Sequence, residues 1–460
     1  MIKSALYRKD TIFALATPVG KGGIGIIRIS GNRAHEILKK VFKPNKSSTG
    51  TPDRRLTLGW AIDFETGEKI DEVLAVAMYP PHTYTREPVA EIQIHSGPAV
   101  IERVMKVVAR AGAVAAMPGE FTLRAFLNGR IDLVKAEAVA DVVNAASSAS
   151  LRAAQAALSG RLTNIIEEVG SELKEILTLA TAFLDFSEAE VGPEPREKII
   201  SKLEALKERL EKLASSYRVG KLISEGVKVA IVGKVNVGKS SLMNRLLEKR
   251  RSIVTPYPGT TRDFIEDTLE IKGLAFRLID MAGMRERPDP IEREGIEIAR
   301  SKAKEADILV TMFDASMSLE AEDLKIWSDY RAREPLIVAN KIDIVDRAAL
   351  EEVKNLCEKS VLEISAKTGE GLDALKSALV ERAKVEPTEE LVLTHERHRE
   401  LVFAASESLG RAINSFISSL PLDICAADIS DAAASLEELT GEITTDEVLD
   451  EIFSKFCIGK

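Results

Sequence analysis

The sequence predicts a multidomain protein of the α/β plus α class, in which an α/β domain is inserted into a helical domain. Three observations carry this prediction: a length of 460 residues, two changes of composition along the chain, and a strand–helix alternation confined to its middle. A chain this long exceeds one hydrophobic core, so about three domains are expected. The predicted ranges are 1–128, 129–222, 223–382 and 383–460, where the second and fourth together form the helical domain.

The first range mixes short β-branched runs with glycine and proline, which predicts an α+β fold. The runs Ile24–Ile29, Glu72–Met78 and Val89–Ile94 have the length and composition of strands. The segment Lys46–Arg55 is rich in Ser, Thr, Gly and Pro and predicts an exposed loop.

The second range changes to Ala, Leu, Glu, Lys and Arg with helical spacing. Leucines at intervals of three, four and three residues place one apolar stripe on a helix, at Leu203, Leu206, Leu210 and Leu213. Pro193 and Pro195 end one helix and begin the next. Helical spacing returns from Leu391 to Phe456, which is why both flanks are assigned to one domain.

The middle of the chain, from Gly226 to about Lys384, alternates strand-like and helix-like segments. Such βαβ alternation predicts a mostly parallel sheet covered by helices. No internal repeat or low-complexity segment interrupts the pattern.

Composition excludes several classes of protein. Hydrophobic residues make up 45% and charged residues 29% of the chain, the balance of a folded soluble protein. No apolar run reaches the roughly 18 to 20 residues that span a bilayer, and the first residues lack the apolar core of a signal peptide. The three cysteines form no CxxC pair, which favours a reducing cytoplasm.

The formal net charge of −9 argues against a general nucleic-acid coat, because phosphate binding draws on clustered Lys and Arg. A single structured RNA remains compatible through a local patch or a partner. With five histidines and no metal-type spacing, a zinc site is not expected. His95 is interpreted as a strand-end histidine with a hydrogen-bond partner.

The strongest motif is Gly233–Ser240, which fits GxxxxGK(S/T) between a predicted strand and a predicted helix. Its glycines let backbone N–H groups surround phosphates, and the helix N-terminus adds partial positive charge. Lys239 is expected to reach the β- and γ-phosphates, and the Ser240 hydroxyl to bind Mg²⁺.

Three further motifs follow in the order that a guanine-nucleotide site requires. Asp280–Gly283 ends a predicted strand and suits the γ-phosphate side, while Ser365–Lys367 suits the base. In Asn340–Asp343 the Asp343 carboxylate can accept two N–H bonds from guanine, which selects GTP over ATP. The predicted GTP-binding residues are Gly233, Asn236, Val237, Gly238, Lys239, Ser240, Ser241, Thr255, Pro256, Tyr257, Pro258, Gly259, Thr260, Asp280, Met281, Ala282, Gly283, Asn340, Lys341, Asp343, Ser365, Ala366 and Lys367.

The sequence indicates less directly how GTP would be hydrolysed. Met284 stands where Ras-like GTPases place a glutamine that orients water, so either hydrolysis is very slow or another group enters the site. Thr261 is a second predicted Mg²⁺ ligand. Neutral oxygens beside the phosphates suit a monovalent cation, which would add positive charge where an arginine finger otherwise lies. The predicted ligands of this cation are Asn236, Thr255, Tyr257 and Thr260.

At this point the chain resembles a known family. The motifs GxxNxGKS, GTTRD, DxAG and NKxD, with Phe456–Lys460 at the end, look like the MnmE/TrmE tRNA-modification GTPases. The resemblance covers the whole chain and includes the segments Thr11–Ile12, Ala16–Pro18, Gly22–Gly31, Pro118–Arg130 and Asp132–Ala138.

The resemblance implies a tetrahydrofolate-binding and dimerisation domain at 1–128, a split helical domain, and an inserted P-loop Ras-like GTPase domain. It implies a cytoplasmic homodimer that joins an FAD-dependent MnmG-type partner in a heterotetramer. Together they would add a (carboxymethyl)aminomethyl group at C5 of the wobble uridine of certain tRNAs. K⁺-assisted association of the GTPase domains would drive hydrolysis coupled to modification.

The resemblance also assigns residues. Glu292 aligns with the family's catalytic glutamate, and Cys457 is implied to act near the nucleoside. A 5-formyl- or 5,10-methylene-tetrahydrofolate would contact Arg28, Glu87, Arg130 and Lys460. The chain departs from the family around Glu87, where Arg86 and Pro88 replace the usual neighbours, and at Arg130, where a lysine is usual.

Alternatives remain open from the residues alone. Cys457 can equally be an inert cysteine near a chain end, and Cys357 and Cys425 are interpreted as packing residues. A GTP-switched ribosome-assembly factor would need a basic RNA-binding module, which the sequence does not contain. A dimeric switch whose N-terminal domain binds no folate is the third reading.

Overall fold

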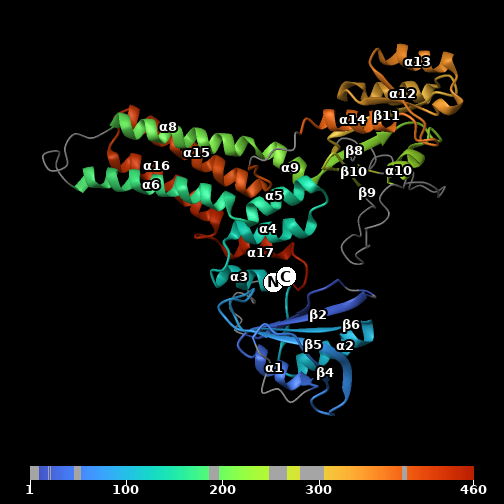
Figure 1. The fold of residues 1–460 in the computed structure, drawn as a ribbon. Coiled ribbons are helices and arrows are strands. Elements are labelled where there is room, and N and C mark those ends of the chain that lie inside the picture. Colours follow the sequence, from blue (N-terminus) through green and yellow to red (C-terminus); the bar gives the residue numbers. More distant parts are fainter. Residues whose placement is uncertain are drawn as a thin grey trace, which may run out of the picture.

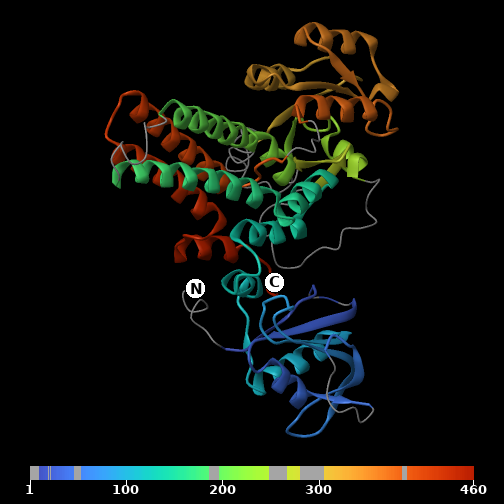
Figure 2. The same ribbon diagram turned by 60° about the vertical axis from the view of Figure 1, so that its left-hand side comes forward.

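The structure of the protein is a computed structural model that describes residues 10–18, 20, 22–45, 53–185, 196–247, 267–279, 305–385 and 391–459. Three bodies are visible in Figure 1: an N-terminal sheet domain, a bundle of long helices, and an α/β domain at one end of the bundle. The view of Figure 2 keeps them distinct, with the sheet domain and the α/β domain on different sides of the bundle. This arrangement confirms the predicted fold class.

The N-terminal domain is built on a seven-stranded sheet in the order β3-β4-β5-β6-β2-β1-β7, antiparallel except for the β1–β7 pair. Two helices pack against it through buried Leu38 and Val108. The elements are β1 (Ile12–Leu15), β2 (Gly22–Ser30), α1 (Ala34–Val41), β3 (Phe42–Pro44), β4 (Thr57–Ile62), β5 (Lys69–Met78), β6 (Val89–Ser96), α2 (Pro98–Arg110) and β7 (Val114–Ala115).

The helical domain is assembled from both flanks of the inserted domain. Its core joins Leu173 and Leu203 from the first segment with Leu409 and Leu436 from the second. All four leucines of the predicted stripe on α8 are buried in this core, which confirms that interpretation. The helices are α4 (Leu133–Asn144), α5 (Ser148–Leu158), α6 (Arg161–Asp185), α8 (Arg196–Ser215), α9 (Tyr217–Glu225), α15 (Glu396–Ile417), α16 (Leu422–Thr440) and α17 (Asp446–Ser454).

Side-chain caps begin several of these helices. Asp132 accepts a hydrogen bond from the backbone N–H of Lys135 at the start of α4. Ser147 and Ser150 form a reciprocal capping box at the start of α5. Such caps satisfy N–H groups that have no acceptor within the helix.

A small apolar cluster joins the helical and N-terminal domains. It combines Leu123 of α3 (Glu120–Leu127), Leu133 of α4 and Phe453 of α17. The chain end lies against β1, where a Cβ on Gly459 would approach the carbonyl oxygen of Leu15 to 2.5 Å. The marked C-terminus in Figure 1 lies at this junction. Contacts therefore cross the predicted boundary at residue 128, and the domain ranges stay a prediction.

The inserted domain has a six-stranded sheet in the order β13-β12-β11-β8-β10-β9, parallel except for β9. Alternate residues of its strand β8 face opposite layers of helices. Val229 and Ile231 pack toward α10 and α14, whereas Ala230 and Val232 pack toward α12. The elements are β8 (Val227–Val232), α10 (Lys239–Leu247), β9 (Asp267–Ile271), β10 (Leu274–Ile279), β11 (Ile308–Asp314), α12 (Ala321–Tyr330), η3 (Arg331–Arg333), β12 (Leu336–Asn340), η4 (Ile342–Ile344), α13 (Arg347–Cys357), β13 (Val361–Glu363) and α14 (Leu372–Ala383).

The inserted domain contacts the bundle at α5 and α9. The N–H of Ala149 on α5 donates to the carbonyl of Gly273 at 3.0 Å, and Ile223 of α9 joins the core of the inserted domain. Within the described ranges, the helices are all too short or too polar to cross a membrane.

Candidate functional site

The predicted phosphate loop lies between β8 and α10, at the carboxyl edge of the sheet. Its backbone turns through left-handed conformations at Asn236 (φ +64°) and Gly238 (φ +103°). Gly233 packs so closely on β11 that an added Cβ would lie 2.5 Å from the carbonyl oxygen of Met312. The glycines of the motif are therefore required by close packing and by backbone conformation.

Lys239 folds back over this loop. Its ammonium group donates to the carbonyl oxygens of Gly233 at 2.6 Å and Lys234 at 2.8 Å. Ser240 and Ser241 follow in the first turn of α10, where backbone N–H groups and the helix dipole favour an anion. The structure thus brings the phosphate-binding candidates Lys239, Ser240 and Ser241 together at one helix start.

Asn340 connects the phosphate loop to the base-binding motifs. Its side-chain NH₂ donates to the carbonyl of Val237 at 2.8 Å, and its side-chain oxygen accepts from the N–H of Ala366 at 2.9 Å. The residue is buried, so both bonds are shielded from water. Two loops far apart in sequence are held as one unit.

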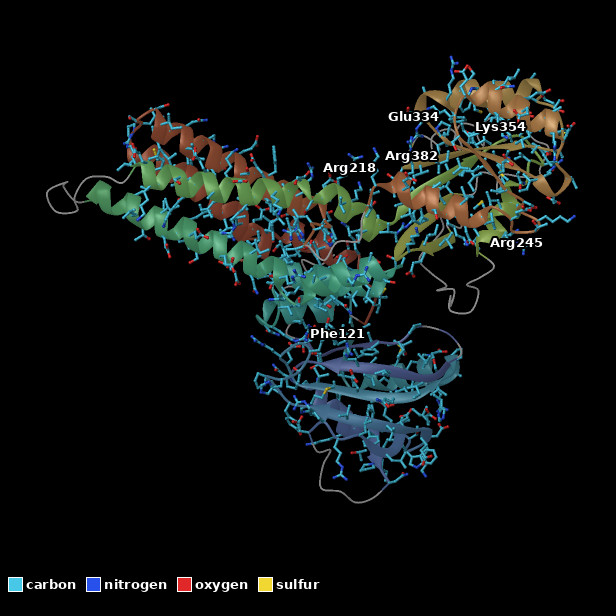
Figure 3. All side chains as sticks on the ribbon, turned by 45° about the horizontal axis from the view of Figure 1, so that its top comes forward. Phe121, Arg218, Arg245, Glu334, Lys354 and Arg382 are labelled. Carbon is cyan, nitrogen blue, oxygen red and sulfur yellow. The ribbon has the colours of Figure 1, made fainter. Side chains whose placement is uncertain are left out.

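The carboxylate of Asp343, the residue predicted to select guanine, is also held in place. The hydroxyl of Ser365 donates to Asp343 Oδ1 at 2.7 Å and accepts from the N–H of Thr368 at 3.1 Å. Arg245 of α10 donates to the carbonyls of Ala366 and Lys367, which ties the same loop to the helix after the phosphate loop. Figure 3 shows Arg245 at the edge of the inserted domain.

Lys341 takes a left-handed conformation with φ +70° and pairs with Asp314 at 2.5 Å. Burial alone would raise the pKa of Asp314, but hydrogen bonds from Lys341 and Ser316 hold that pKa below its ordinary value. Asp314 therefore stays ionised and fixes the lysine of the NKxD motif.

Several predicted residues lie outside the described residues. They include the catalytic candidate Glu292, the folate candidate Lys460, and most of the predicted metal ligands. The full set is Thr255, Pro256, Tyr257, Pro258, Gly259, Thr260, Thr261, Asp280, Met281, Ala282, Gly283, Glu292 and Lys460. Their roles stay predictions from the sequence.

In the N-terminal domain, Arg28 and Arg130 meet on one aromatic ring. Their guanidinium carbons lie 5.4 and 4.6 Å from the ring centroid of Tyr84. Arg28 also pairs with Glu91 at 2.8 Å and lies over Phe121. The two arginines that the family resemblance assigned to folate are thus neighbours in space, although they are 102 positions apart in the sequence.

Glu87 lies at the centre of a polar network beside this ring. Its carboxylate accepts from the hydroxyl of Ser30 at 2.8 Å and from Arg124 at 3.2 and 3.3 Å. Arg124 is buried and also pairs with buried Glu120 at 2.9 Å. The sequence analysis missed Tyr84 and Arg124 as site residues, although Arg124 lies inside the segment Pro118–Arg130 that the family resemblance had marked.

The cysteines differ in exposure as expected. Cys357 and Cys425 are buried, and burial raises the pKa of the Cys357 thiol to about 11, so it stays protonated. Cys457 is exposed, and its carbonyl accepts from the N–H of Gly119. His95 is the penultimate residue of β6 and contacts Asp71 at 2.7 Å, which agrees with its structural interpretation. No metal-type cluster of His, Cys, Asp and Glu occurs in the part of the chain that the structure describes.

A phosphate loop before α10, with the segment Asn340–Asp343 at the end of β12 and Ser365–Lys367 after β13, is the arrangement of a P-loop GTPase. The remaining question is its family. A family model described as "MnmE helical domain" matches residues 133–457, and one described as "GTP-binding protein TrmE N-terminus" matches residues 11–130.

The curated relatives agree. The "tRNA modification GTPase MnmE" of Acetivibrio thermocellus is 40% identical over 99% of this chain and its own full length. Its namesake from Syntrophus aciditrophicus is 44% identical over 98% of this chain and its own full length. The chain therefore belongs to the MnmE family of GTP hydrolases, whose members are named for tRNA modification.

Among solved structures, Era in complex with MgGDPNP and ribosomal RNA is 29% identical over 40% of this chain and 66% of its own. The TM-score is 0.29, and the family assignment rests on the relatives above.

Proposed function

We propose that this protein is the GTP-hydrolysing, folate-binding subunit of a cytoplasmic complex that modifies C5 of the wobble uridine in certain tRNAs. The group added would be aminomethyl or carboxymethylaminomethyl, and an FAD-dependent MnmG-type partner would complete a heterotetramer with the homodimer. The observation that carries the folate part is the convergence of Arg28 and Arg130 on Tyr84, beside the network of Glu87. Family membership favours tRNA modification over ribosome assembly.

The residues of the N-terminal domain fit a tetrahydrofolate. Arg28 and Arg130 can pair with the glutamyl carboxylates, and the flat face of Tyr84 offers a surface for a ring. The Glu87 carboxylate, oriented by Ser30 and Arg124, can accept N–H groups from a pterin edge. The bound folate would supply the one-carbon unit of the reaction.

The inserted domain fits GTP. Lys239 and the start of α10 would hold the β- and γ-phosphates, and Ser240 would provide a hydroxyl ligand to Mg²⁺. Asp343, fixed by Ser365, would accept the two N–H groups that distinguish guanine from adenine. Ser240 shares its proposed Mg²⁺ role with Thr261.

Hydrolysis is proposed to depend on K⁺ and on pairing of two GTPase domains. Asn236 is exposed on the phosphate loop in a left-handed conformation, so its side chain is accessible to a cation or a second copy. Glu292 would orient the attacking water. GTP turnover should be faster in KCl than in NaCl at equal ionic strength. Asn236→Ala should remove that difference while GDP binding stays within about threefold.

The folate site is tested by calorimetric titration of 5-formyltetrahydrofolate into the full protein. Wild type should bind saturably, and Arg28→Ala should weaken binding at least tenfold, about 1.4 kcal/mol. Arg33→Ala is the matched control, because Arg33 is an exposed arginine whose guanidinium group pairs with Glu36 of α1. Absence of binding in wild type, with GTP hydrolysis intact, would favour the dimeric switch without folate.

Cys457 is proposed to take part in tRNA modification through its exposed thiol. Cys457→Ser should lower modification in the complete system while GTP hydrolysis is retained. Near-normal modification by this variant would show that the thiol is dispensable. Cys425→Ser, the same change at a buried cysteine, controls for the loss of sulfur alone.

A further inference from the structure

Lys234, the second residue of the phosphate loop, makes a buried ion pair that the loop motif does not require. Its side chain is only 7% exposed, and its ammonium nitrogen lies 3.0 Å from Asp323 Oδ2 and 3.3 Å from Glu320 Oε2. Asp323 belongs to α12, and Glu320 is the residue immediately before that helix. This ion pair thus connects the phosphate loop to α12, the helix that follows β11 in the sequence.

The partner is itself fixed in place. The Asp323 side chain is 2% exposed, and its Oδ2 also accepts the N–H of Glu320 at 3.0 Å, completing the cap of α12. Burial alone would lower the pKa of Lys234, but the carboxylates of Asp323 and Glu320 raise it above its ordinary value. Lys234 therefore stays charged, and removal of Asp323 would leave its ammonium group with only the exposed carboxylate of Glu320.

The ion pair of Lys234 acts on the amino-terminal half of the phosphate loop. The carbonyl of Lys234 accepts one of the two loop bonds from Lys239, and Asn236 takes a left-handed conformation two residues later. Left-handed non-glycine residues persist only where their surroundings enforce them. Asn340 holds the carboxyl half of the loop through Val237, and Lys234 holds the amino half through Asp323.

We propose that Lys234 is a positioning residue for nucleotide binding, which fixes the amino-terminal half of the phosphate loop to α12 through Asp323. Backbone N–H groups of the loop are then arranged for a diphosphate before it arrives, which lowers the ordering cost of binding. This inference rests on the proposed binding of guanine nucleotides by the inserted domain. Lys234 would touch no phosphate through its side chain.

The test measures GDP and IDP affinity of the full protein by calorimetry for wild type, Lys234→Arg, Lys234→Met and Asp323→Asn. IDP lacks the 2-amino group that Asp343 recognises, so the GDP-to-IDP ratio reports the base site alone. Lys234→Met should weaken both nucleotides about tenfold with an unchanged ratio, and Asp323→Asn about threefold. Lys234→Arg keeps the charge and should bind within about twofold of wild type.

Lys354→Met is the matched control, because Lys354 of α13 makes a solvent-accessible ion pair with Glu363 of β13. Figure 3 places Lys354 and Arg245 of α10 on different sides of the inserted domain. GDP affinity of Lys354→Met should equal that of wild type. If Lys234→Met fails to fold, Asp323→Asn and Lys234→Arg still decide.

Wild-type GDP affinity in Lys234→Met would overturn the inference, and so would wild-type affinity in Asp323→Asn. Equal losses of affinity in Lys234→Arg and Lys234→Met would overturn it as well. A wild-type protein that binds no GDP would instead overturn the proposed nucleotide site. A changed GDP-to-IDP ratio in Lys234→Met would mean general disruption of the domain, and it too would count against a positioning role.

Discussion

Arg397 on α15 meets Glu137 on α4 through two nitrogens, at 2.9 and 3.2 Å, although 260 residues separate them. His398 approaches the same carboxylate at 2.5 Å. Arg397 also donates to the carbonyls of Glu438 and Leu439 at the end of α16. This buried cluster ties the helix before the inserted domain to two helices after it.

The same α4 also contacts the junction with the N-terminal domain. Leu133 and Ala136 pack with Phe453 of α17, while Glu137 and Asp141 hold the first turn of α15. The chain returning from the inserted domain is held against α9 by the N–H of Leu393, which donates to the hydroxyl of Ser216 at 3.0 Å. Helix α4 is therefore in contact with both the start of α15 and the junction with the N-terminal domain.

Replacing Arg397 with methionine should destabilise the helical domain strongly. Glu137 would remain buried with His398 alone, and breaking a buried ion pair by removing one partner costs about 3–5 kcal/mol. Arg411→Met on the same helix is the control: that side chain is 54% exposed, and its pair with Asp428 contributes about 0–1 kcal/mol. Urea unfolding followed by circular dichroism measures both. Equal losses of stability would contradict a special role for the buried pair.

His395 should make stability depend on pH above neutrality. Burial lowers its pKa, but the hydrogen bond that the ring donates to Asp141 and the charges of Glu137 and Asp141 raise it above the ordinary 6.5 overall. A raised pKa in the folded state gives stability that is complete below pH 6.5 and is lost as pH rises through the folded value. The stability gap between wild type and His395→Gln, about 1 kcal/mol at pH 6, should therefore shrink toward pH 9.

The control for this measurement is His82→Gln, the same change at an exposed histidine. Glu137 contributes in the opposite direction. Burial would raise its pKa, but His398 and Arg397 hold that pKa far below the ordinary 4.5. Its contribution is present above pH 4.5 and disappears only on further acidification. A gap that stays constant from pH 6 to pH 9 would contradict the assignment to His395.

Features with a local signature were predictable from the sequence. The stripe of leucines on α8 and the motif Gly233–Ser240 each occupy one short stretch, and both form the expected element. The order of the motifs along the chain also indicated which segments would bind the guanine base, because the carboxyl ends of parallel strands lie at one edge of the sheet. These parts of the site follow from spacing and residue type alone.

Features made by distant side chains were not predictable in this way. Lys234 occupies an unspecified position of the loop motif, and nothing near it in sequence indicates Asp323 as a partner. Arg28 and Arg130 were assigned only through a family resemblance, and that resemblance did not indicate Tyr84 between them. Ion pairs and ring contacts between residues far apart in the sequence depend on the packed fold, so a single sequence carries little information about them.

Ser365→Ala should weaken guanine recognition without unfolding the domain. The variant loses the hydroxyl that orients Asp343 and accepts the N–H of Thr368. A hydrogen bond to a charged group contributes about 1.5–3 kcal/mol, so GDP affinity should fall about tenfold or more. The preference for GDP over IDP should fall as well. Thr368→Ala in the same loop should keep that preference, and a loss there equal to that of Ser365→Ala would show a nonspecific loop effect.

Gly238→Ala should abolish nucleotide binding for two separate reasons. Its φ of +103° is unfavourable for alanine, and the added Cβ would lie 2.3 Å from Asn340 Nδ2. Because that amide joins the phosphate loop to the base loop, its displacement should lower GDP affinity at least about 100-fold, or 2.7 kcal/mol.

Gly369→Ala separates the two reasons. Gly369 has a similar φ of +91°, but an added Cβ would meet Arg245 Nε at an ordinary 3.9 Å. This control carries the backbone strain of about 1 kcal/mol without the collision, and it should bind GDP within about threefold of wild type. Comparable losses in both variants would mean that strain alone impairs the site. A loss confined to Gly238→Ala would establish that the contact with Asn340 is what the phosphate loop cannot do without.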